Sequence, residues 1–311
     1  MNRFLIDETF DTNAHADWIA YRKPVLPFYD DYCFIREIET SLLLRNTLSK
    51  FENATEVWHS PICTFLINYL SWDTNYFGID TFKITGCLFG DGDKQQLLNE
   101  FKIFFQEFYT VHPACRIVAE IPSEDFEMLQ GLSFSGLRLI EGRLIHFKHP
   151  LRETEKVAYR KANRQDAENL GRVASKMRNP ADRFHADMIF DNTAADEYLY
   201  TYAKACVEGF TDVVIVPDEP GVPSNSFIAI NYRVHDRKWN VLSPAQIVLT
   251  AVDSDTNKGW YKKLIHAAVN HVIDEGAGCL YNTTQITNKA VIYTLESLGF
   301  KLGCTRMLFT N

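Results

Sequence analysis

Residues 246–300 read QIVLTAVDSDTNKGWYKKLIHAAVNHVIDEGAGCLYNTTQITNKAVIYTLESLGF, and this stretch decides the fold. The apolar segment Gln246 to Val252 predicts a strand, and a polar turn ending in Asn257-Lys258-Gly259 leads into an amphipathic helix. A second strand is predicted from Cys279 to Thr284. A glycine turn at a helix start leaves free N–H groups at the positive end of the helix dipole. It therefore predicts a site for an anion such as a pyrophosphate.

The end of this stretch predicts a short helix that begins after Asn288 and closes on Leu298-Gly299-Phe300. Asn288 is a suitable N-cap, because its side chain can accept a hydrogen bond from the first turn of the helix. Helical spacing places Leu295 on an apolar face and Tyr293 on the opposite side.

This order of elements resembles the acetyl-CoA-binding half of the GNAT acyltransferase superfamily. The common turn there is Q/R-x-x-G-x-G/A, and Thr256-Asn257-Lys258-Gly259-Trp260-Tyr261 matches its first glycine, with Thr256 and Tyr261 as departures. The resemblance implies that the first strand pairs with the pantetheine and that the turn holds the pyrophosphate of acetyl-CoA. The coenzyme contacts that it implies are Leu249, Ala251, Val252, Asn257, Lys258, Gly259, Trp260, Tyr261, Lys262 and Asn288.

The closing helix departs from the superfamily at one position. Members often show N-x-x-A-x-x-x-Y-x-x-x-G-F, where the tyrosine protonates the departing thiolate, and Leu295 stands at that position here. The usual general acid is therefore absent by resemblance. Three functions stay open: an N-acetyltransferase, a non-catalytic acyl-CoA-binding or regulatory module, and a scaffold protein that binds no coenzyme.

Two upstream segments, Trp72 to Ile79 and Asn179 to Asp187, resemble TDP-fucosamine acetyltransferases, as does Thr284 to Asn288. This resemblance implies a small-molecule amine acceptor, the amino group of a nucleotide-linked deoxy-sugar. Arg183 and His185 are candidate substrate-binding residues, since arginine binds phosphate through two hydrogen bonds and histidine can relay a proton. The alternative is an ordinary charged helix end.

Direct transfer needs a base for the ammonium proton and a donor to the tetrahedral oxyanion. A backbone N–H from Leu249 to Val252 is the expected oxyanion donor. The base is unassigned, and His185 and Tyr281 are the two catalytic candidates.

The first half of the chain shows the same order in weaker form, with predicted strands at 81–88 and 116–121 and predicted helices at 94–109 and 123–130. It closes on Leu132-Ser133-Phe134. In contrast to the second half, no glycine turn is predicted to open a helix before this ending. The prediction is an α/β protein of two GNAT-like domains, each with a mixed central sheet flanked by helices. The first, over 1–150, is a reduced copy with an irregular leader that binds no coenzyme, and the complete copy covers 155–311.

Several local features are also predicted. The polar segment 149–155 separates the two domains, and Asn163 with Asp166 forms a capping box at a helix start. The segment 70–79 reads as an aromatic turn, and a pair of strands runs to Phe147. A short helix is predicted over 37–44.

Composition restricts the remaining functions. The net charge of −8 disfavours a nucleic-acid partner, and the absence of an apolar run of about 18 residues predicts no membrane span. The seven cysteines are scattered and odd in number, which favours reduced thiols in the cytoplasm. The histidines lack ligand spacing, so no metal cofactor is expected. A homodimer is compatible with the sequence.

Overall fold

The computed structural model describes residues 4–6, 14–22, 56–232 and 243–311. The chain divides into two compact units: unit 1 is Met1–Gly142 with Cys304–Asn311, and unit 2 is Arg143–Gly303. This division lies ahead of the predicted linker at 149–155, and it returns the end of the chain to unit 1. The predicted helix over 37–44 lies outside the described residues.

Unit 1 contains most of the elements of the first half of the chain. They are β1 (Phe4–Ile6), α1 (Ala16–Arg22), β2 (Glu56–His59), β3 (Cys63–Tyr69), α3 (Ser71–Phe77), β4 (Thr81–Phe89), α4 (Lys94–Val111), β5 (Arg116–Pro122), α5 (Phe126–Phe134), the start of β6 (Arg138–Lys148) and the end of β12 (Lys301–Thr310). Its strands follow the order β1-β2-β3-β4-β5-β12. The pair β4–β5 is parallel and the other pairs are antiparallel.

The core of unit 1 is built largely from phenylalanine. The ring of Phe65 on β3 stacks on that of Phe104 on α4, with centroids 3.9 Å apart. Gly131 lets α5 pack tightly on α4, because a Cβ atom there would lie 2.5 Å from the ring of Phe101. Aromatic stacking and close helix packing together hold α4 and α5 on this sheet.

Unit 2 contains most of the elements of the second half of the chain. They are the end of β6, β7 (Tyr159–Lys161), a 3₁₀ turn (Arg164–Asp166), α6 (Ala167–Lys176), α7 (Asn192–Ala205), a π-helical turn (Cys206–Phe210), β8 (Val213–Pro217), β9 (Ser226–Tyr232), β10 (Pro244–Val252), α8 (Trp260–Asp274), β11 (Cys279–Gln285), α9 (Lys289–Ser297) and the start of β12. The strand order is β6-β11-β10-β9-β8-β7, with β10 and β11 parallel and the other pairs antiparallel.

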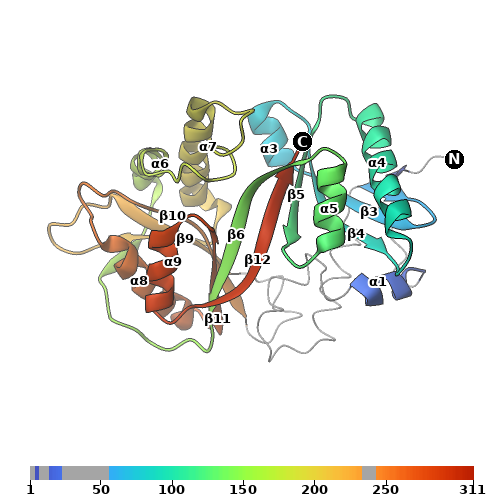
Figure 1. The fold of residues 1–311 in the computed structure, drawn as a ribbon. Helices are drawn as coiled ribbons and strands as arrows, with labels where there is room; N and C mark the ends of the chain where they lie inside the picture. Colours follow the sequence, from blue (N-terminus) through green and yellow to red (C-terminus); the bar gives the residue numbers. More distant parts are fainter. Residues whose placement is uncertain (1–3, 7–13, 23–55, 233–242) are drawn as a thin grey trace. The chain divides into compact units, whose positions relative to one another are not determined.

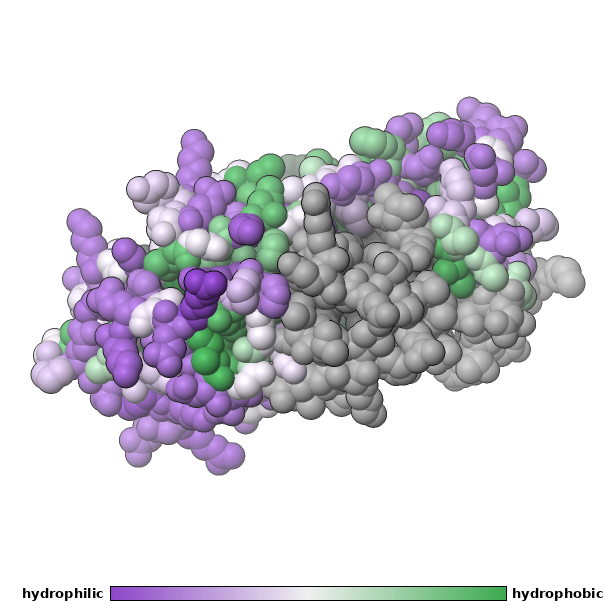
Figure 2. Space-filling view, turned by 90° about the horizontal axis from the view of Figure 1, so that it is seen from below, coloured by the Kyte–Doolittle hydropathy of each residue, from purple (hydrophilic) through white to green (hydrophobic). Residues whose placement is uncertain are grey.

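Helices cover both faces of the unit 2 sheet (Figure 1). One apolar cluster lies beneath α8 and α9 and includes Leu264 and Leu295, and another lies beneath α6 and includes Leu170 and Phe227. The amphipathic stripe predicted for α8 is therefore core packing. On the face shown in Figure 2, hydrophilic side chains dominate the surface of unit 2.

The structure confirms the predicted α/β class with a mixed sheet flanked by helices, and it corrects three local expectations. The segment 70–79 holds a short helix, α3, which ends at Gly78 in the left-handed conformation. The expected pair of strands before Phe147 is the single long strand β6. The helix expected from Ser123 begins at Phe126, because Asp125 caps it. The capping box of Asn163 and Asp166 is confirmed.

Candidate functional site

The central feature of unit 2 is a divergence between its two parallel strands. β10 and β11 pair only as far as Ile247 and Asn282. A bulge follows Ile247; among the described strands, β10 then continues to Val252 beside β9 alone and β11 continues to Gln285 beside β6. The peptide groups of β10 from Leu249 onward therefore lack a ladder partner on the β11 side. Bulges that end pairing in this way are common beside functional sites.

Thr250 lies on the diverging part of β10, and the sequence analysis did not single it out. It pairs with Ile228 of β9, whose side chain belongs to the core beneath α8, so Thr250 faces that same side of the sheet. Its hydroxyl oxygen is buried and has no hydrogen-bond partner within the described ranges. A threonine inside the apolar run QIVLTAV was the signal that could have identified it.

The turn after β10 presents the start of α8. Gly259 adopts φ +85°, a left-handed conformation that glycine tolerates, and no side chain caps the helix there. A Cβ atom at Gly259 would meet nothing within 4 Å, so the turn faces open space. The N–H of Trp260 already donates to the carbonyl of Asn257 at 3.0 Å. The other N–H groups of the first turn of α8 lie at the positive end of its dipole without a side-chain cap, as an anion site requires.

Lysines surround this helix start. Lys258 and Lys262 are exposed and form no ion pair among the described residues. Lys263 is already engaged, because its ammonium bonds both carboxylate oxygens of Glu219 at 2.7 and 3.0 Å and lies 4.7 Å from the centroid of the Trp260 ring. Two free cations thus add positive potential to the uncapped turn.

Other residues of the predicted coenzyme-contact set are buried or partly buried at the turn. The Trp260 side chain is buried in the core beneath α8. Asn257 is also buried, and its amide donates to the carbonyl of Pro223 while its Oδ1 has no partner within the part of the chain described. Burial raises the pKa of the Tyr261 hydroxyl, which therefore stays neutral. Lys258, Gly259 and Lys262 are the members of the predicted set that face solvent.

Asn288 is confirmed as the N-cap of α9, where its Oδ1 accepts from the N–H of Val291 at 3.4 Å. It follows directly on the free end of β11, beside the divergence. Leu295 is fully buried and Tyr293 is largely exposed, as their helical spacing predicted. The position of the superfamily's tyrosine is therefore part of the hydrophobic core.

His185 lies in the loop between α6 and α7, and both of its ring nitrogens face carboxylates. Nδ1 is 2.7 Å from Oδ2 of Asp182, and Nε2 is 3.0 Å from Oδ1 of Asp196. The side chain is almost completely buried. A ring held at both nitrogens offers no lone pair to an incoming ammonium, so this geometry fixes the loop rather than supplying a base.

The two remaining predicted residues are also held by neighbours. The Arg183 guanidinium lies 4.3 Å from the centroid of the Phe184 ring and donates to the hydroxyl of Tyr198 at 3.0 Å. Tyr281 lies in the paired part of β11, opposite Gln246, and its side chain is buried. Neither Tyr281 nor His185 presents an accessible proton acceptor in this arrangement.

The segment after α6 is tied to both diverging strands. The ammonium of Lys176 contacts Asp253 and Asp255, just beyond β10, at 3.2 and 2.8 Å. The side chain of Asn179 donates to Oε1 of Gln285, at the end of β11, at 2.8 Å. The backbone N–H of Asp255 and the Lys176 ammonium lower the pKa of Asp253. This segment therefore borders the opening between the strands.

Unit 1 contains a glycine turn that the sequence analysis missed. Gly90-Asp91-Gly92-Asp93 joins β4 to α4, so the statement that no glycine turn opens a helix there was wrong. Its chemistry is opposite to that of the unit 2 turn. The carboxylate of Asp93 accepts from the N–H groups of Gln95 and Gln96 at 2.9 and 3.4 Å. An acid side chain thus takes the place of an external anion at this helix start.

No set of three or more His, Cys, Asp or Glu side chains in the described ranges is arranged to hold a metal ion. No helix in those ranges is long and apolar enough to cross a membrane.

No protein-family model matches the sequence, and no curated protein matches it. Solved structures do match the fold. A GCN5-related N-acetyltransferase from Sphaerobacter thermophilus aligns with a TM-score of 0.56 at 10% identity, covering 100% of this chain and 96% of that one. A tandem GNAT protein from the clavulanic acid biosynthesis pathway aligns with a TM-score of 0.50 at 11% identity, covering 99% and 97%.

A glucosamine N-acetyltransferase region in a fungal multi-domain β-N-acetylglucosaminidase aligns with a TM-score of 0.60 at 10% identity, covering 99% of this chain and 38% of that one. These likenesses show that the chain has the GNAT fold, as the order of its elements predicted.

Proposed function

We propose that the chain is an acetyl-CoA-dependent N-acetyltransferase that moves the acetyl group to a primary amine by direct transfer. The observation that carries this proposal is the divergence of β10 and β11 beside the uncapped, glycine-opened start of α8. Unpaired strand groups can bond an extended ligand as another strand would, and the helix start suits a pyrophosphate. Acetyl-CoA combines an extended amide-containing arm with a pyrophosphate.

In this proposal each part of the site has one task. The backbone of Leu249 to Val252 bonds the pantetheine arm, and the first N–H groups of α8 bond the pyrophosphate. Lys258 and Lys262 balance its charge, and Asn288 contacts the coenzyme from the start of α9. The buried hydroxyl of Thr250 stands on the diverging part of β10, on the α8 side of the sheet, and is a polar group that the resemblance does not supply.

The chemistry is attack of a neutral amine on the thioester carbonyl. A C–N bond forms, the carbonyl oxygen becomes an oxyanion, and the C–S bond then breaks to release the CoA thiolate. A backbone N–H of the diverging part of β10 stabilises the oxyanion. Because His185 and Tyr281 are held or buried, the ammonium proton passes to water that enters the opening. The thiolate also takes its proton from solvent, since Leu295 replaces the usual acid.

The acceptor that we propose is an amino sugar, with a nucleotide-linked 4-amino-deoxy-sugar as the first choice. The segment that carries this resemblance, 179–187, borders the opening through the bond from Asn179 to Gln285. Arg183 stands in that segment as a partner for phosphate. We include glucosamine among the acceptors to test, because one of the similar structures contains a glucosamine N-acetyltransferase region.

We further propose that unit 1 is a reduced copy of unit 2, and that the protein works in the cytoplasm, where its thiols stay reduced. A second candidate function is a non-catalytic acyl-CoA-binding module. The burial of Leu295 and the engagement of both His185 nitrogens favour it, because they leave the site without an acid or a base of its own.

Calorimetric titration of the full chain with acetyl-CoA and with CoA tests the binding site. A thiol-release assay over glucosamine, a nucleotide-linked 4-amino-sugar and simple alkylamines then tests catalysis. We expect one coenzyme per chain and thiol release that depends on the amine. Binding without amine-dependent release would favour the acyl-CoA-binding module, and the absence of any binding would contradict both functions.

A further inference from the structure

Unit 1 repeats the strand divergence of unit 2. β4 and β5 pair in parallel only as far as Ile84 and Ala119, just as β10 and β11 pair only as far as Ile247 and Asn282. A register shift in the pairing of β3 with β4 follows Ile84, as the bulge in β10 follows Ile247. The peptide groups at the end of β4 thus correspond to those that we propose bond the coenzyme in unit 2.

The helix that follows the second strand corresponds as well. Asp125 caps α5 and follows Ala119 by as many residues as Asn288, the cap of α9, follows Asn282. Cys87 of β4 follows Ile84 by as many residues as Thr250 of β10 follows Ile247, so these two positions also correspond. The N-cap is therefore a carboxylate in unit 1 and a neutral amide in unit 2.

The opening in unit 1 is filled by the side chain of Arg22, the last residue of α1. Its Nε donates to the backbone carbonyl of Cys87 at 3.1 Å. Its two terminal nitrogens donate to the two oxygens of Asp125 at 2.9 and 2.5 Å. The guanidinium also lies 4.1 Å from the centroid of the Phe89 ring. One side chain thus bonds the free end of β4 and the cap of α5 together.

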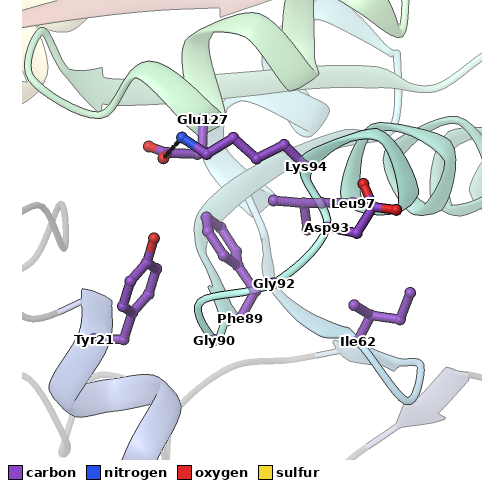
Figure 3. A pocket seen from close by; sticks show the side chains of 9 residues that line it. All are labelled: Tyr21, Ile62, Phe89, Gly90, Gly92, Asp93, Lys94, Leu97 and Glu127. Carbon is purple, nitrogen blue, oxygen red and sulfur yellow. Dashed lines mark hydrogen bonds and ion pairs between the residues drawn. The ribbon is translucent and has the colours of Figure 1, made fainter.

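This ion pair is sealed from solvent. Arg22 is 1% exposed and Asp125 is 0% exposed. A buried charge pair of this kind needs good geometry and a full set of hydrogen bonds, and the planar fork of arginine supplies both. A small open pocket lies beside it, lined by Tyr21, Phe89, Lys94 and Glu127 among others (Figure 3). Two of these lining residues, Lys94 and Glu127, form an ion pair at 3.1 Å.

We infer that Arg22 is an intramolecular ligand that occupies, in unit 1, the place that the coenzyme takes in unit 2. This inference rests on the proposed function, because it takes the corresponding opening in unit 2 to be the coenzyme site. The site in unit 1 is selective for a planar guanidinium cation, because its groups are a backbone carbonyl, a bidentate carboxylate and an aromatic face. Removal of the Arg22 side chain therefore leaves a cavity that a free alkylguanidinium fills.

The test is chemical rescue of the full-length Arg22→Ala variant with methylguanidinium chloride at low millimolar concentration. Loss of one partner of a buried ion pair should lower the Tm of unit 1 by about 10 °C. Methylguanidinium should restore most of that loss in a saturable manner. The matched control is Arg172→Ala, which removes an exposed arginine of α6 and should show neither the loss nor the rescue. Rescue should also be absent in Arg22→Ala/Asp125→Ala.

An unchanged Tm in Arg22→Ala, or an equal effect of methylguanidinium on the control, would overturn the inference. If Arg22→Ala is insoluble, Arg22→Lys must still lose Tm relative to Arg172→Lys, because an ammonium lacks the planar fork that bonds both Asp125 oxygens in parallel while Nε bonds Cys87. Equal Tm values would overturn the inference. The readout needs no coenzyme, and Arg22→Ala should keep the acetyl-CoA affinity of unit 2. Failure of the rescue and failure of coenzyme binding are therefore separate outcomes.

Discussion

Asn179 and Gln285 join the loop after α6 to the free end of β11 through one hydrogen bond of 2.8 Å between their side chains. A neutral hydrogen bond of this kind contributes about 1 kcal/mol. We expect Asn179→Ala to loosen the loop, so that a protease cleaves the segment 177–191 faster than in the wild type. The KM for the amine should rise several-fold with little change in acetyl-CoA affinity. A double-mutant cycle with Gln285→Ala checks that the effect comes from this pair.

Gly259→Asp should abolish tight coenzyme binding. The substitution places a carboxylate at the start of α8, where it repels the pyrophosphate and caps the helix as Asp93 does in unit 1. The left-handed φ of Gly259 adds strain for any other residue, so Gly259→Asn is the matched control. We expect the asparagine variant to bind acetyl-CoA measurably and the aspartate variant to lose several kcal/mol of affinity. Equal affinities in the two variants would contradict the assignment.

Much of unit 2 could be predicted from the sequence because its signals are local. Hydrophobic periodicity placed β10, α8 and β11, and cap chemistry placed Asn163 and Asn288 at helix starts. The candidate site was harder to predict from the sequence. The bulge after Ile247 depends on three strands together, and no residue between Gln246 and Val252 marks it.

Features of unit 1 were also hard to predict from the sequence. Arg22 meets Cys87 and Asp125 across 65 and 103 residues of chain, so no local pattern could connect them. The turn at Gly90 carries acids, where the unit 2 turn carries Lys258 beside its glycine. The contacts of Arg22 are therefore absent from any local pattern, whereas the turn at Gly90 is a local feature of the sequence.

Tyr293→Phe should leave turnover unchanged. Tyr293 is 77% exposed on α9, whereas Leu295 on the same helix is 0% exposed and belongs to the hydrophobic core of unit 2. The burial also changes what is expected of Leu295→Tyr. A larger side chain in a filled core costs about 1–3 kcal/mol, so it should lower stability before it could restore an acid. Steady-state thiol release and thermal unfolding measure the two effects, and loss of turnover in Tyr293→Phe would place the acid on the exposed face.

A fragment of residues 1–150 should fail to fold cooperatively. Unit 1 includes the end of the chain, where Arg306 to Thr310 pair with β5 in antiparallel register. Without that strand, one edge of β5 has no partner, and unit 1 lacks the buried side chains of Leu308 and Phe309. Circular dichroism melting of the fragment should show a broad transition, and appending 301–311 through a flexible linker should sharpen it. A sharp transition for 1–150 alone would show that β12 is dispensable.

The stability of unit 2 should fall as the pH drops below about 6.5, the ordinary pKa of histidine. Burial lowers the pKa of His146, His266 and His271, so the folded unit binds fewer protons than the unfolded chain in this range. Their neutral forms are favoured on folding. The stabilisation is therefore complete above the unfolded pKa and is lost as the pH falls from 6.5 toward the lower folded values.

His146 offers the sharpest test of this pH dependence. It is fully buried, and its ring nitrogens make no hydrogen bond among the described residues, although Nε2 lies 3.6 Å from Oε1 of Glu296. Each such histidine can add a slope of at most about 1.4 kcal/mol per pH unit to the free energy of unfolding. We expect urea unfolding of His146→Leu to show a smaller decline between pH 7 and pH 5 than the wild type, with no loss at pH 7. An unchanged decline would mean that the His146 ring is protonated in the folded chain as easily as in the unfolded one.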